Sequence, residues 1–399
     1  MHDATICLCC TVYVLLHSMK IVLTGGGSGG HFYPLIAVVE GIEEICKERR
    51  LIEPKFYYIG PMPFDMATLT EHDIEYRPGT AGKIKSSERS LAPITGPFKI
   101  VFGILRALPQ LFSIYPDVVF STGGYAAFPT LYAARLLQIP VVIYDADAAP
   151  GRVSLWSGKF ARWIAVAHPD AAGKFPEKMR EKIARTGHPI RTEIEQPARE
   201  GGHEFLKLDP TVPTIFIVGG SQGAQAINEV VLDSLPTLLQ KYNVVHQAGT
   251  NNVADVSGIA SVALNTIPHA DRYRVFGLLN ALALKMTAGI TSLVISRAGS
   301  GSIFEIASWG IPAILVPIPI DVSHDQTENA FSYARAGAAI VIEQRNLSTH
   351  VLIAEIDRLM TDEDARAAMK TAAASYARPQ AGRKIGEIIL STAIEHEPV

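Results

Sequence analysis

The chain has 399 residues, of which 48% are hydrophobic and 19% are charged, and it contains 32 glycines and 25 prolines. That length accommodates two domains with separate cores, and the composition suits an α/β protein. The formal net charge of −3 excludes a chain-wide basic surface for nucleic acid. The four cysteines form no pair of C-x-x-C motifs, so neither a zinc site nor a disulfide framework is expected, and a reducing compartment is the simplest interpretation.

The first 18 residues differ from the rest of the chain. They contain an apolar run at 6–16 that is too short to span a bilayer, and they lack the basic region and small-residue cleavage site of a secretory signal. Met19 leads directly into an expected strand at 20–24. We therefore expect residues 1–18 to be a disordered extension or a start-site artefact.

A glycine-rich loop at 25–31 follows this strand, and Pro34 is expected to open the next helix. The loop glycines fit G-x-G-x-x-G, but the following strand, at 55–59, does not end in the acid that binds an NAD ribose, so we reject NAD. The loop still offers backbone N–H groups to a phosphate or a sugar. His31 is either a helix-start residue bonded to backbone or a general base tuned near neutral pH.

Residues 79–112 combine cations with more apolar residues than a one-sided helix needs. The cations are Lys83, Lys85, Arg89, Lys99 and Arg106, and the apolar residues are Ile94, Phe98, Ile100, Val101, Phe102, Ile104 and Leu105. Two interpretations are equally open. The segment is a peripheral contact with an anionic membrane, or it is a buried helix with solvated flanks.

Further strands follow in the first half of the chain. They are expected at 117–121, 140–144 and 162–167. The second of them ends in a loop with Asp145 and Asp147, a candidate polar site. Two carboxylates supply too few oxygen atoms for a hard cation, so we expect no metal there. The polar segment 192–213 contains proline and glycine and is expected to link two domains.

The strand–glycine loop–helix arrangement then recurs, with a strand at 214–218, a loop at 219–224 and a helix at 226–240. Further strands are expected at 243–247 and 273–276. Two such units predict an α/β protein with two Rossmann-like domains whose parallel sheets face each other across a cleft.

A third small-residue loop, 296–301, connects a buried strand to a short helix that stops at Gly310. The free N–H groups at that helix start would face an anion. Glu305 has two interpretations. With Ser302 it forms a capping box, which the pattern alone favours, or it binds the ribose diol of a nucleotide.

Gln326 and Asn329 stand about one turn apart at the next helix. Their spacing either positions both amides to hydrogen-bond a ligand or simply makes a polar helix face.

Three motifs in this order resemble the MurG family of bacterial peptidoglycan glycosyltransferases. They are GGGSGGH at 25–31, GGSQGAQAIN at 219–228, and SRAGSGSIFEIASWGIPAILVPIP at 296–319 with HDQTENA at 324–330. The likeness runs from about Lys20 to the last helix. It implies the GT-B fold, with an acceptor and membrane-facing domain at 19–190 completed by a helix at about 380–397, and a UDP-sugar-binding domain at 191–379.

The resemblance also implies an activity. It is the inverting, metal-independent transfer of N-acetylglucosamine from UDP-N-acetylglucosamine to the 4-hydroxyl of the muramyl sugar of undecaprenyl-pyrophosphoryl-MurNAc-pentapeptide (lipid I), which gives lipid II. No cofactor and no nucleic acid is implied. The protein would lie peripherally on the cytoplasmic face of the inner membrane.

Site residues carry over from the resemblance position by position. His31 matches the family's histidine and is the expected catalytic base. The expected substrate-binding residues are Ser28, Gly29, Gly30, Asp147, Arg191, Ser221, Gln222, Ser300, Gly301, Ser302, Ile303, Phe304, Glu305, Gln326 and Asn329. The match gives Glu305 both roles, third helical residue of a capping box and ribose ligand.

The chain departs from the family at a few positions. Tyr144-Asp145-Ala146-Asp147 stands where the family has His-Glu-Gln-Asn, His188 replaces an Asn, and Asp325 replaces a Gln. Asp147 is expected to be a charged clamp paired with Arg152, or else a base that shares the acceptor proton with His31. The departures keep two rivals open, a related transferase for another lipid acceptor and a UDP-sugar-binding homologue without catalysis.

Overall fold

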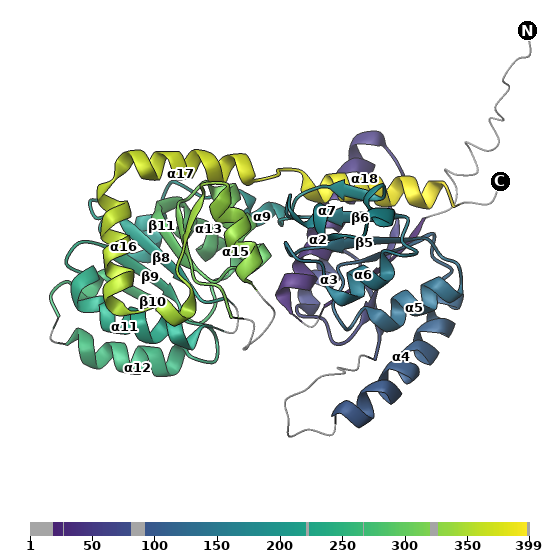
Figure 1. Cartoon of the computed structure of the whole chain (residues 1–399), viewed down its shortest axis with the longest axis horizontal. Coiled ribbons are helices and arrows are strands. Elements are labelled where there is room, and N and C mark those ends of the chain that lie inside the picture. Colours follow the sequence, from purple (N-terminus) through teal and green to yellow (C-terminus); the bar gives the residue numbers. More distant parts are fainter. Residues whose placement is uncertain are drawn as a thin grey trace, which may run out of the picture. The chain divides into compact units, whose positions relative to one another are not determined.

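A computed structural model of the chain describes residues 19–26, 28–80, 92–220, 223–265, 267–319 and 326–396, with the backbone alone for 92–97. The chain forms two compact units, Met1–Arg191 with Gln380–Val399, and Thr192–Pro379 (Figure 1). The segment 1–18 lies outside the described residues, and so do the three cations expected at 83, 85 and 89. Among the described helices, none has the length and apolar content needed to cross a membrane.

The N-terminal unit is built on a parallel seven-stranded sheet of order β3-β2-β1-β4-β5-β6-β7. The strands are β1 Lys20–Thr24, β2 Lys55–Gly60, β3 Glu75–Pro78, β4 Val118–Ser121, β5 Val141–Asp145, β6 Trp163–Val166 and β7 Ile183–Arg185. The central strands are runs of buried Val, Ile and Leu, as expected of a sheet covered on both faces. Because all strands are parallel, their carboxyl ends meet at one edge, and β1 forms where the sequence predicted it.

Helices cover both faces of this sheet (Figure 1). They are α2 Gly29–Arg49, α3 Met66–Glu71, α4 Ala92–Ile114, α5 Phe128–Leu136, α6 Arg152–Ser157, α7 Ala171–Lys174, α8 Glu177–Arg180 and α18 Ala381–Ile394. Glycines allow α18 to approach α2 closely. A Cβ atom at Gly41 would lie 2.6 Å from the backbone of Gly382, and one at Gly382 would lie 2.3 Å from the carbonyl oxygen of Ala37. The last helix of the chain therefore belongs to the core of the first unit.

The expectation that Pro34 opens α2 is wrong. The helix begins at Gly29, and Pro34 is its sixth residue. The amides of His31 and Phe32 both donate to the carbonyl of Ser28, each at 3.1 Å, so the helix is already formed before the proline. At the sixth helical position, proline removes only one backbone hydrogen-bond donor from the helix. Because α2 begins at Gly29, His31 lies in the first helical turn.

The C-terminal unit contains a second parallel sheet, of order β10-β9-β8-β11-β12-β13. Its strands are β8 Thr214–Val218, β9 Asn243–Gln247, β10 Tyr273–Phe276, β11 Thr291–Ser296, β12 Ala313–Leu315 and β13 Ala339–Val341. Its helices are α9 Thr192–Glu195, α10 Gly202–Leu206, α11 Gln225–Leu238, α12 Val253–Leu264, α13 Ala281–Ile290, α14 Ser300–Trp309, α15 Thr327–Arg335, α16 Thr349–Thr361 and α17 Glu363–Tyr376. The first three strands match their expected bounds, and two parallel α/β sheets confirm the predicted fold class.

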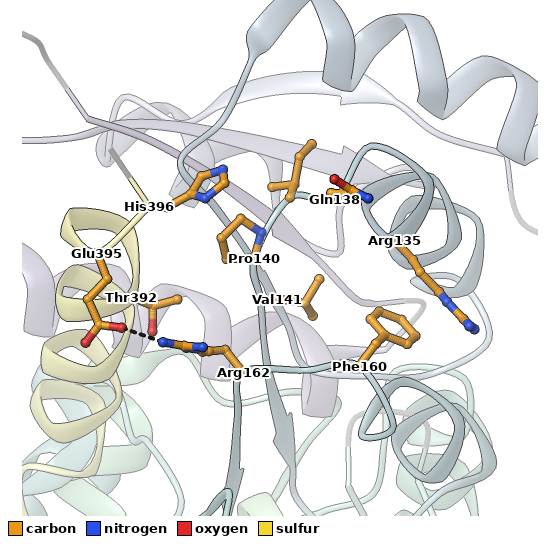
Figure 2. Close-up of a pocket in the computed structure, with 10 residues that line it drawn as sticks. Arg135, Gln138, Pro140, Val141, Phe160, Arg162, Thr392, Glu395 and His396 are labelled. Carbon is orange, nitrogen blue, oxygen red and sulfur yellow. Dashed lines mark hydrogen bonds and ion pairs between the residues drawn. The ribbon is translucent and has the colours of Figure 1, made fainter. Parts of the chain in front are cut away.

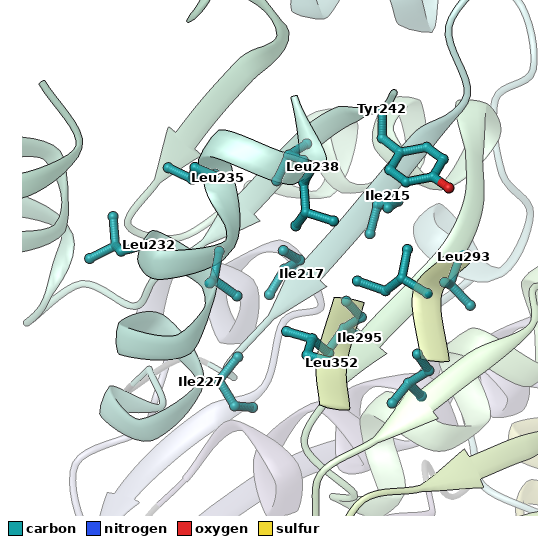
Figure 3. Packing of buried hydrophobic residues seen from close by; sticks show 14 of the residues in the cluster. Ile215, Ile217, Ile227, Leu232, Leu235, Leu238, Tyr242, Leu293, Ile295 and Leu352 are labelled. Carbon is teal, nitrogen blue, oxygen red and sulfur yellow. The ribbon is translucent and has the colours of Figure 1, made fainter. Parts of the chain in front are cut away.

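A continuous apolar core joins this sheet to α11 (Figure 3). Ile227 and Leu235 lie on one face of α11 because they are separated by eight residues, which is slightly more than two helical turns. They pack over Ile217 of β8 and its neighbours Leu293 and Ile295 of β11, all completely or almost completely buried. This packing holds rigid the strands whose carboxyl ends carry the second and third glycine loops.

The segment 192–213 is not the open linker that its composition suggested. It contains α9 and α10, and the indole N–H of Trp309 donates to the carbonyl of Ile194 at 2.9 Å. A Cβ atom at Gly289 would lie only 1.7 Å from the carbonyl oxygen of Ala198. The segment is therefore packed onto the C-terminal unit, because its few apolar and backbone groups find partners on α13 and α14.

Candidate functional site

The first glycine loop places His31 at the carboxyl edge of the N-terminal sheet. Its Nδ1 lies 2.9 Å from the carbonyl oxygen of Thr122, and the Thr122 hydroxyl donates to the His31 carbonyl at 2.8 Å. A carbonyl can only accept, so Nδ1 carries the proton, and neutral His31 has its lone pair on Nε2. The ring is thus oriented by backbone with the nitrogen that accepts a proton turned away from Thr122.

Two glycines make this arrangement sterically feasible. A Cβ atom at Gly25 would lie 2.1 Å from Oγ1 of Thr122, and one at Gly124, where φ is +78°, would lie 3.3 Å from Nε2 of His31. The buried Tyr58 hydroxyl also donates to the Gly25 carbonyl at 2.9 Å. Thr122 and Tyr58 are positioning residues that the sequence did not reveal, since each is far from the loop along the chain.

Ser28, Gly29 and Gly30, which were expected in the loop before the helix, lie at the start of α2, where Ser28 is the N-cap residue. The free N–H groups of such a helix start, together with the helix dipole, favour an anion. The expected ligand Arg191 is the last residue of this unit, and its guanidinium carbon lies 3.8 Å from the centre of the Tyr33 ring. The aromatic face stacks against the planar cation and restricts its orientation.

Tyr144 and His188, two residues at which the chain departs from the family motifs, are in contact. The Tyr144 hydroxyl and Nδ1 of His188 are hydrogen bonded at 2.6 Å, and both side chains are buried. Burial lowers the pKa of His188 to about 3 and raises the pKa of Tyr144 well above its usual value, so both groups are neutral. The pair ties the end of β5 to the segment that leads to Arg191.

The loop after β5 is anchored by Asp145. Its carboxylate accepts from the amides of Asp147 at 3.2 Å and Gly151 at 3.1 Å. Burial raises the pKa of Asp145 to about 6, opposed by the hydrogen bond from Ser154 and reinforced by the charge of Asp147. Asp147 is half-buried on this anchored loop and Arg152 is exposed at the start of α6. The interpretation of Asp147 as clamp or base stays open.

In the C-terminal unit, the capping box predicted for Ser302 and Glu305 is wrong. Helix α14 begins at Ser300 with Gly299 as its N-cap, so Ser302 is the third helical residue and Glu305 the sixth. The extended backbone of Gly299 lets the chain enter the helix earlier than the serine-glutamate spacing implied. Glu305 is half-buried on the second turn, and its contact with a ribose stays a prediction.

The amide side chains at the start of α15 hold the loop that precedes α14. Oε1 of Gln326 accepts from the backbone amides of Ala298 at 3.1 Å and Ile318 at 3.3 Å. The Asn329 amide is buried and donates to the Ala298 carbonyl at 3.3 Å. Nε2 of Gln326 lies 3.5 Å from the position of a Cβ atom on Gly299, which places its N–H donors at the helix start. Gln326 can therefore face a ligand, whereas Asn329 positions the loop.

The other expected residues of this region fall into two groups. Ile303 and Phe304 are completely buried, and Phe304 packs on Tyr376 with ring centres 5.3 Å apart, so only their backbone can contact a ligand. Ser300 is buried, and Gly301 and Ser302 are half-buried at the helix start. Ser221 and Gln222 lie outside the described residues.

Arg297, at the end of β11, has no role in the sequence interpretation. Only 8% of it is exposed, and its guanidinium donates to the carbonyl of Val316 at 3.1 Å. Burial lowers its pKa from the usual value, but an arginine remains charged at neutral pH. The side chain therefore places a buried positive charge against the carbonyls that follow β12, while its backbone belongs to the loop that leads into α14. The sequence feature that could have indicated this buried charge is the position of Arg297 between an expected buried strand and a small-residue loop.

Two surface pockets lie away from these carboxyl edges. One of about 330 Å³ in the N-terminal unit is lined by Pro140 and Val141, where β5 begins, and an ion pair of 3.0 Å joins Arg162 to Glu395 at its rim (Figure 2). The other, of about 420 Å³, lies near Pro312, before β12 in the C-terminal unit. Open α/β sheets bind ligands at the opposite, carboxyl ends of their strands, so neither pocket is the candidate site.

Comparison with known proteins assigns both units to one glycosyltransferase family. The glycosyltransferase family 28 N-terminal domain matches residues 21–166, and the family 28 C-terminal domain matches residues 214–384. The chain is 33% identical, over 359 residues, to the UDP-N-acetylglucosamine–N-acetylmuramyl-(pentapeptide) pyrophosphoryl-undecaprenol N-acetylglucosamine transferase 2 of Bacillus thuringiensis subsp. konkukian, covering 90% of this chain and 95% of that one.

Two further relatives agree with this assignment. The transferase of the same activity from Legionella pneumophila strain Paris is 34% identical over 349 residues, which cover 87% of this chain and 90% of the relative. The crystal structure of Acinetobacter baumannii MurG superposes with a TM-score of 0.68 at 26% identity, covering 94% of this chain and 99% of that one. The chain therefore belongs to the MurG family, within glycosyltransferase family 28, and its two parallel α/β units form the GT-B fold.

Proposed function

We propose that this protein transfers N-acetylglucosamine from UDP-N-acetylglucosamine to the muramyl sugar of an N-acetylmuramyl-(pentapeptide) pyrophosphoryl-undecaprenol lipid, a step of peptidoglycan synthesis. The observation that carries the proposal is the similarity, over 90% of the chain, to transferases named for this activity. The motifs of both units lie within the matched regions.

The donor half of the proposal rests on the C-terminal unit. The start of α14 offers backbone N–H groups, and Arg297, in the loop between β11 and α14, carries a buried positive charge. Both features favour the diphosphate of a UDP-sugar and the negative charge that it gains as it leaves. Glu305 on the second turn would accept hydrogen bonds from the ribose hydroxyls, and the Gln326 amide would contact the donor sugar.

The acceptor half rests on the N-terminal unit. The acceptor's 4-hydroxyl oxygen forms a bond to the anomeric carbon, while the bond from that carbon to the diphosphate breaks. The hydroxyl proton passes to Nε2 of His31, whose Nδ1 proton is held by the Thr122 carbonyl. A base that is already in the correct tautomer lowers the barrier without prior reorganisation of the ring.

We also propose a peripheral contact of α4 with the cytoplasmic face of the membrane. Gly103, Ala107 and Leu111 are buried, so they face the unit's interior. The opposite face carries large apolar side chains that are each more than half exposed, namely Phe98, Val101, Phe102, Leu105 and Phe112. Lys99 and Arg106 are exposed on the same helix, and apolar area combined with cations is what binding to an anionic surface needs.

Labelled UDP-N-acetylglucosamine, incubated with and without the lipid acceptor, tests the activity. We expect labelled sugar in the lipid product and release of UDP only when the acceptor is present. Donor binding without transfer would instead favour a non-catalytic homologue, and transfer to a different lipid would favour a related transferase.

Vesicles test the membrane contact separately. Replacing Phe98 and Leu105 by serine should weaken binding to anionic vesicles. Replacing Lys83, Lys85 and Arg89 by glutamine should cost about 1 kcal/mol per charge at low salt if these cations join the same surface. Parent-like vesicle binding by both variants would reject the contact.

A further inference from the structure

Three large apolar side chains are exposed between β2 and the start of α3. Met62 is 80% exposed, Phe64 43% and Met66 42%. Single exposed apolar residues are ordinary on protein surfaces, but three within five residues of one short segment need an explanation. We call Met62, Phe64 and Met66 the apolar lip.

The apolar lip is held in place from both sides. The Phe64 ring packs on Tyr33, with ring centres 5.5 Å apart and nearly perpendicular, and on Phe32 at 6.5 Å. The Asp65 carboxylate accepts from the amides of Ala67 at 3.0 Å and Thr68 at 3.3 Å, which caps α3. The charge of Asp65, which stands between Phe64 and Met66, is thus used by the helix start, and the apolar groups are presented on a defined backbone.

The apolar lip adjoins the first glycine loop. A Cβ atom at Gly29, the first residue of α2, would lie 3.4 Å from the Phe64 ring. A ligand group held by the N–H groups at the start of α2 would therefore lie next to the Phe64 ring, the part of the lip that touches this loop.

On its other side, the apolar lip is connected to α4. The amide of Gly79 donates to the carbonyl of Gly60, just before the lip, at 2.6 Å. The next residue, Thr80, touches α4, since a Cβ atom at Gly103 would lie 2.4 Å from the Thr80 carbonyl oxygen. A short backbone path thus leads from the glycine loop past the lip to the helix whose outer face is apolar.

We propose that the apolar lip contacts the first isoprene units of the acceptor's polyprenyl chain. The inference rests on the proposed function, in which the acceptor is a pyrophosphoryl-undecaprenol. Such a molecule changes from dianionic diphosphate to pure hydrocarbon across one bond. A matching surface must change from N–H donors to apolar side chains over the same short distance, and the start of α2 followed by Phe64 and the two methionines has this order. Methionine suits the task because its flexible side chain adapts to an irregular chain.

Two water-soluble acceptor analogues with the same head group test the proposal, one carrying two isoprene units and the other four. The assay contains no vesicles or micelles, so a bilayer cannot contribute. With the parent protein, KM should be lower for the longer analogue. In the variant Met62→Ser with Met66→Ser, KM for the longer analogue should rise roughly fivefold to tenfold, as expected when two apolar side chains that the isoprene units would partly cover are lost. KM for UDP-N-acetylglucosamine should not change.

The double variant Ile259→Ser with Val262→Ser is the matched control, since both residues are exposed apolar side chains on α12 of the other unit. It should keep the parent's preference for the longer analogue. The proposal is overturned if the parent does not distinguish the analogues, or if the Met62 and Met66 variant keeps the preference. Weaker vesicle binding by that variant with an intact preference would show that the lip contacts the bilayer instead. Absence of transfer to either analogue and to the undecaprenyl lipid would overturn the proposed function itself.

Discussion

The two glycine-loop units share one plan of strand, loop and helix, yet their carboxyl edges differ in chemistry. The N-terminal edge gathers titratable side chains, with His31, Tyr144, Asp145 and His188 on or beside it. The C-terminal edge uses backbone N–H groups, the amides of Gln326 and Asn329, and the permanently charged Arg297. Within the first set, Tyr144 and His188 stay neutral and position the loop, whereas Nε2 of His31 can accept a proton. The second set can only bind charge and hydroxyl groups. The comparison separates proton transfer from donor binding, and single substitutions can test it.

The largest effect is expected at His31. Replacing it by asparagine should lower kcat by about 10²–10⁴-fold, because the acceptor hydroxyl loses its base, and leave UDP-N-acetylglucosamine affinity close to that of the parent. Steady-state kinetics and calorimetric donor titration measure the two quantities. A parent-like kcat would show that another residue of this edge is the base.

Glu305→Gln should affect donor binding at the carboxyl edge of the C-terminal unit. Removing a charged acceptor of ribose hydroxyls should raise the donor KM by an amount equivalent to about 1.5–3 kcal/mol. Stability should barely change, since Glu305 is not part of a capping box. Ser302→Ala is the control for the disproved cap, and it should leave the melting temperature near that of the parent. An unchanged donor KM in Glu305→Gln would remove this residue from the donor site.

Tyr144→Phe should destabilise the protein by about 1–3 kcal/mol, because it leaves a buried nitrogen of His188 without its partner. The double variant Tyr144→His with His188→Asn has both residues of the family. It should lose less unfolding free energy than the sum of the losses in the single variants Tyr144→His and His188→Asn. Urea unfolding of the parent, the two single variants and the double variant gives the coupling energy. Additive losses would mean that the two departures are independent.

Stability should also depend on pH. The folded-state pKa is lowered by burial to about 3 in His188 and about 4 in His168 and His246. The unfolded chain therefore binds more protons below about pH 6.5, and each histidine removes up to about 1.4 kcal/mol per pH unit as the pH falls toward its folded value.

Asp145 acts in the opposite direction. Its pKa is raised to about 6, so its contribution to stability is present below pH 3.8 and is lost as the pH rises through 6. Unfolding free energies at several pH values should show a net loss on acidification. The loss should be steeper in Asp145→Asn, and an equal slope in both proteins would contradict the assignment.

The last substitution is at Asp147, and the size of its effect depends on the role of this residue. If Asp147 is a clamp, Asp147→Asn restores the amide found in the family and should leave the shape of the pH–rate profile unchanged. If it is a base, the same change should cost about 10²–10⁴-fold in kcat and remove the acidic limb. The pH–rate profile of this variant thus decides whether the N-terminal edge has one base or two.

The sequence alone was sufficient for the three glycine loops, the alternation of strands and helices, and the family. The bounds of β1, β8, β9 and β10 follow from apolar runs flanked by glycine or polar residues, which are local signals. The identities of His31, Gln326 and Glu305 as candidate residues came from motifs of a few adjacent positions. Patterns of this kind can be recognised in the sequence because each depends only on residues that are neighbours along the chain.

The tertiary structure decided what those residues contact. The tautomer of His31 depends on Thr122, 91 residues away, and Tyr144 meets His188 across 44 residues. The capping box failed because a serine and a glutamate at the right spacing do not determine where α14 begins. The apolar lip has no sequence signature, since exposure of Met62 and Met66 depends on what packs around them. Hydrogen bonds and burial join residues that are distant along the chain, and only folding brings these together.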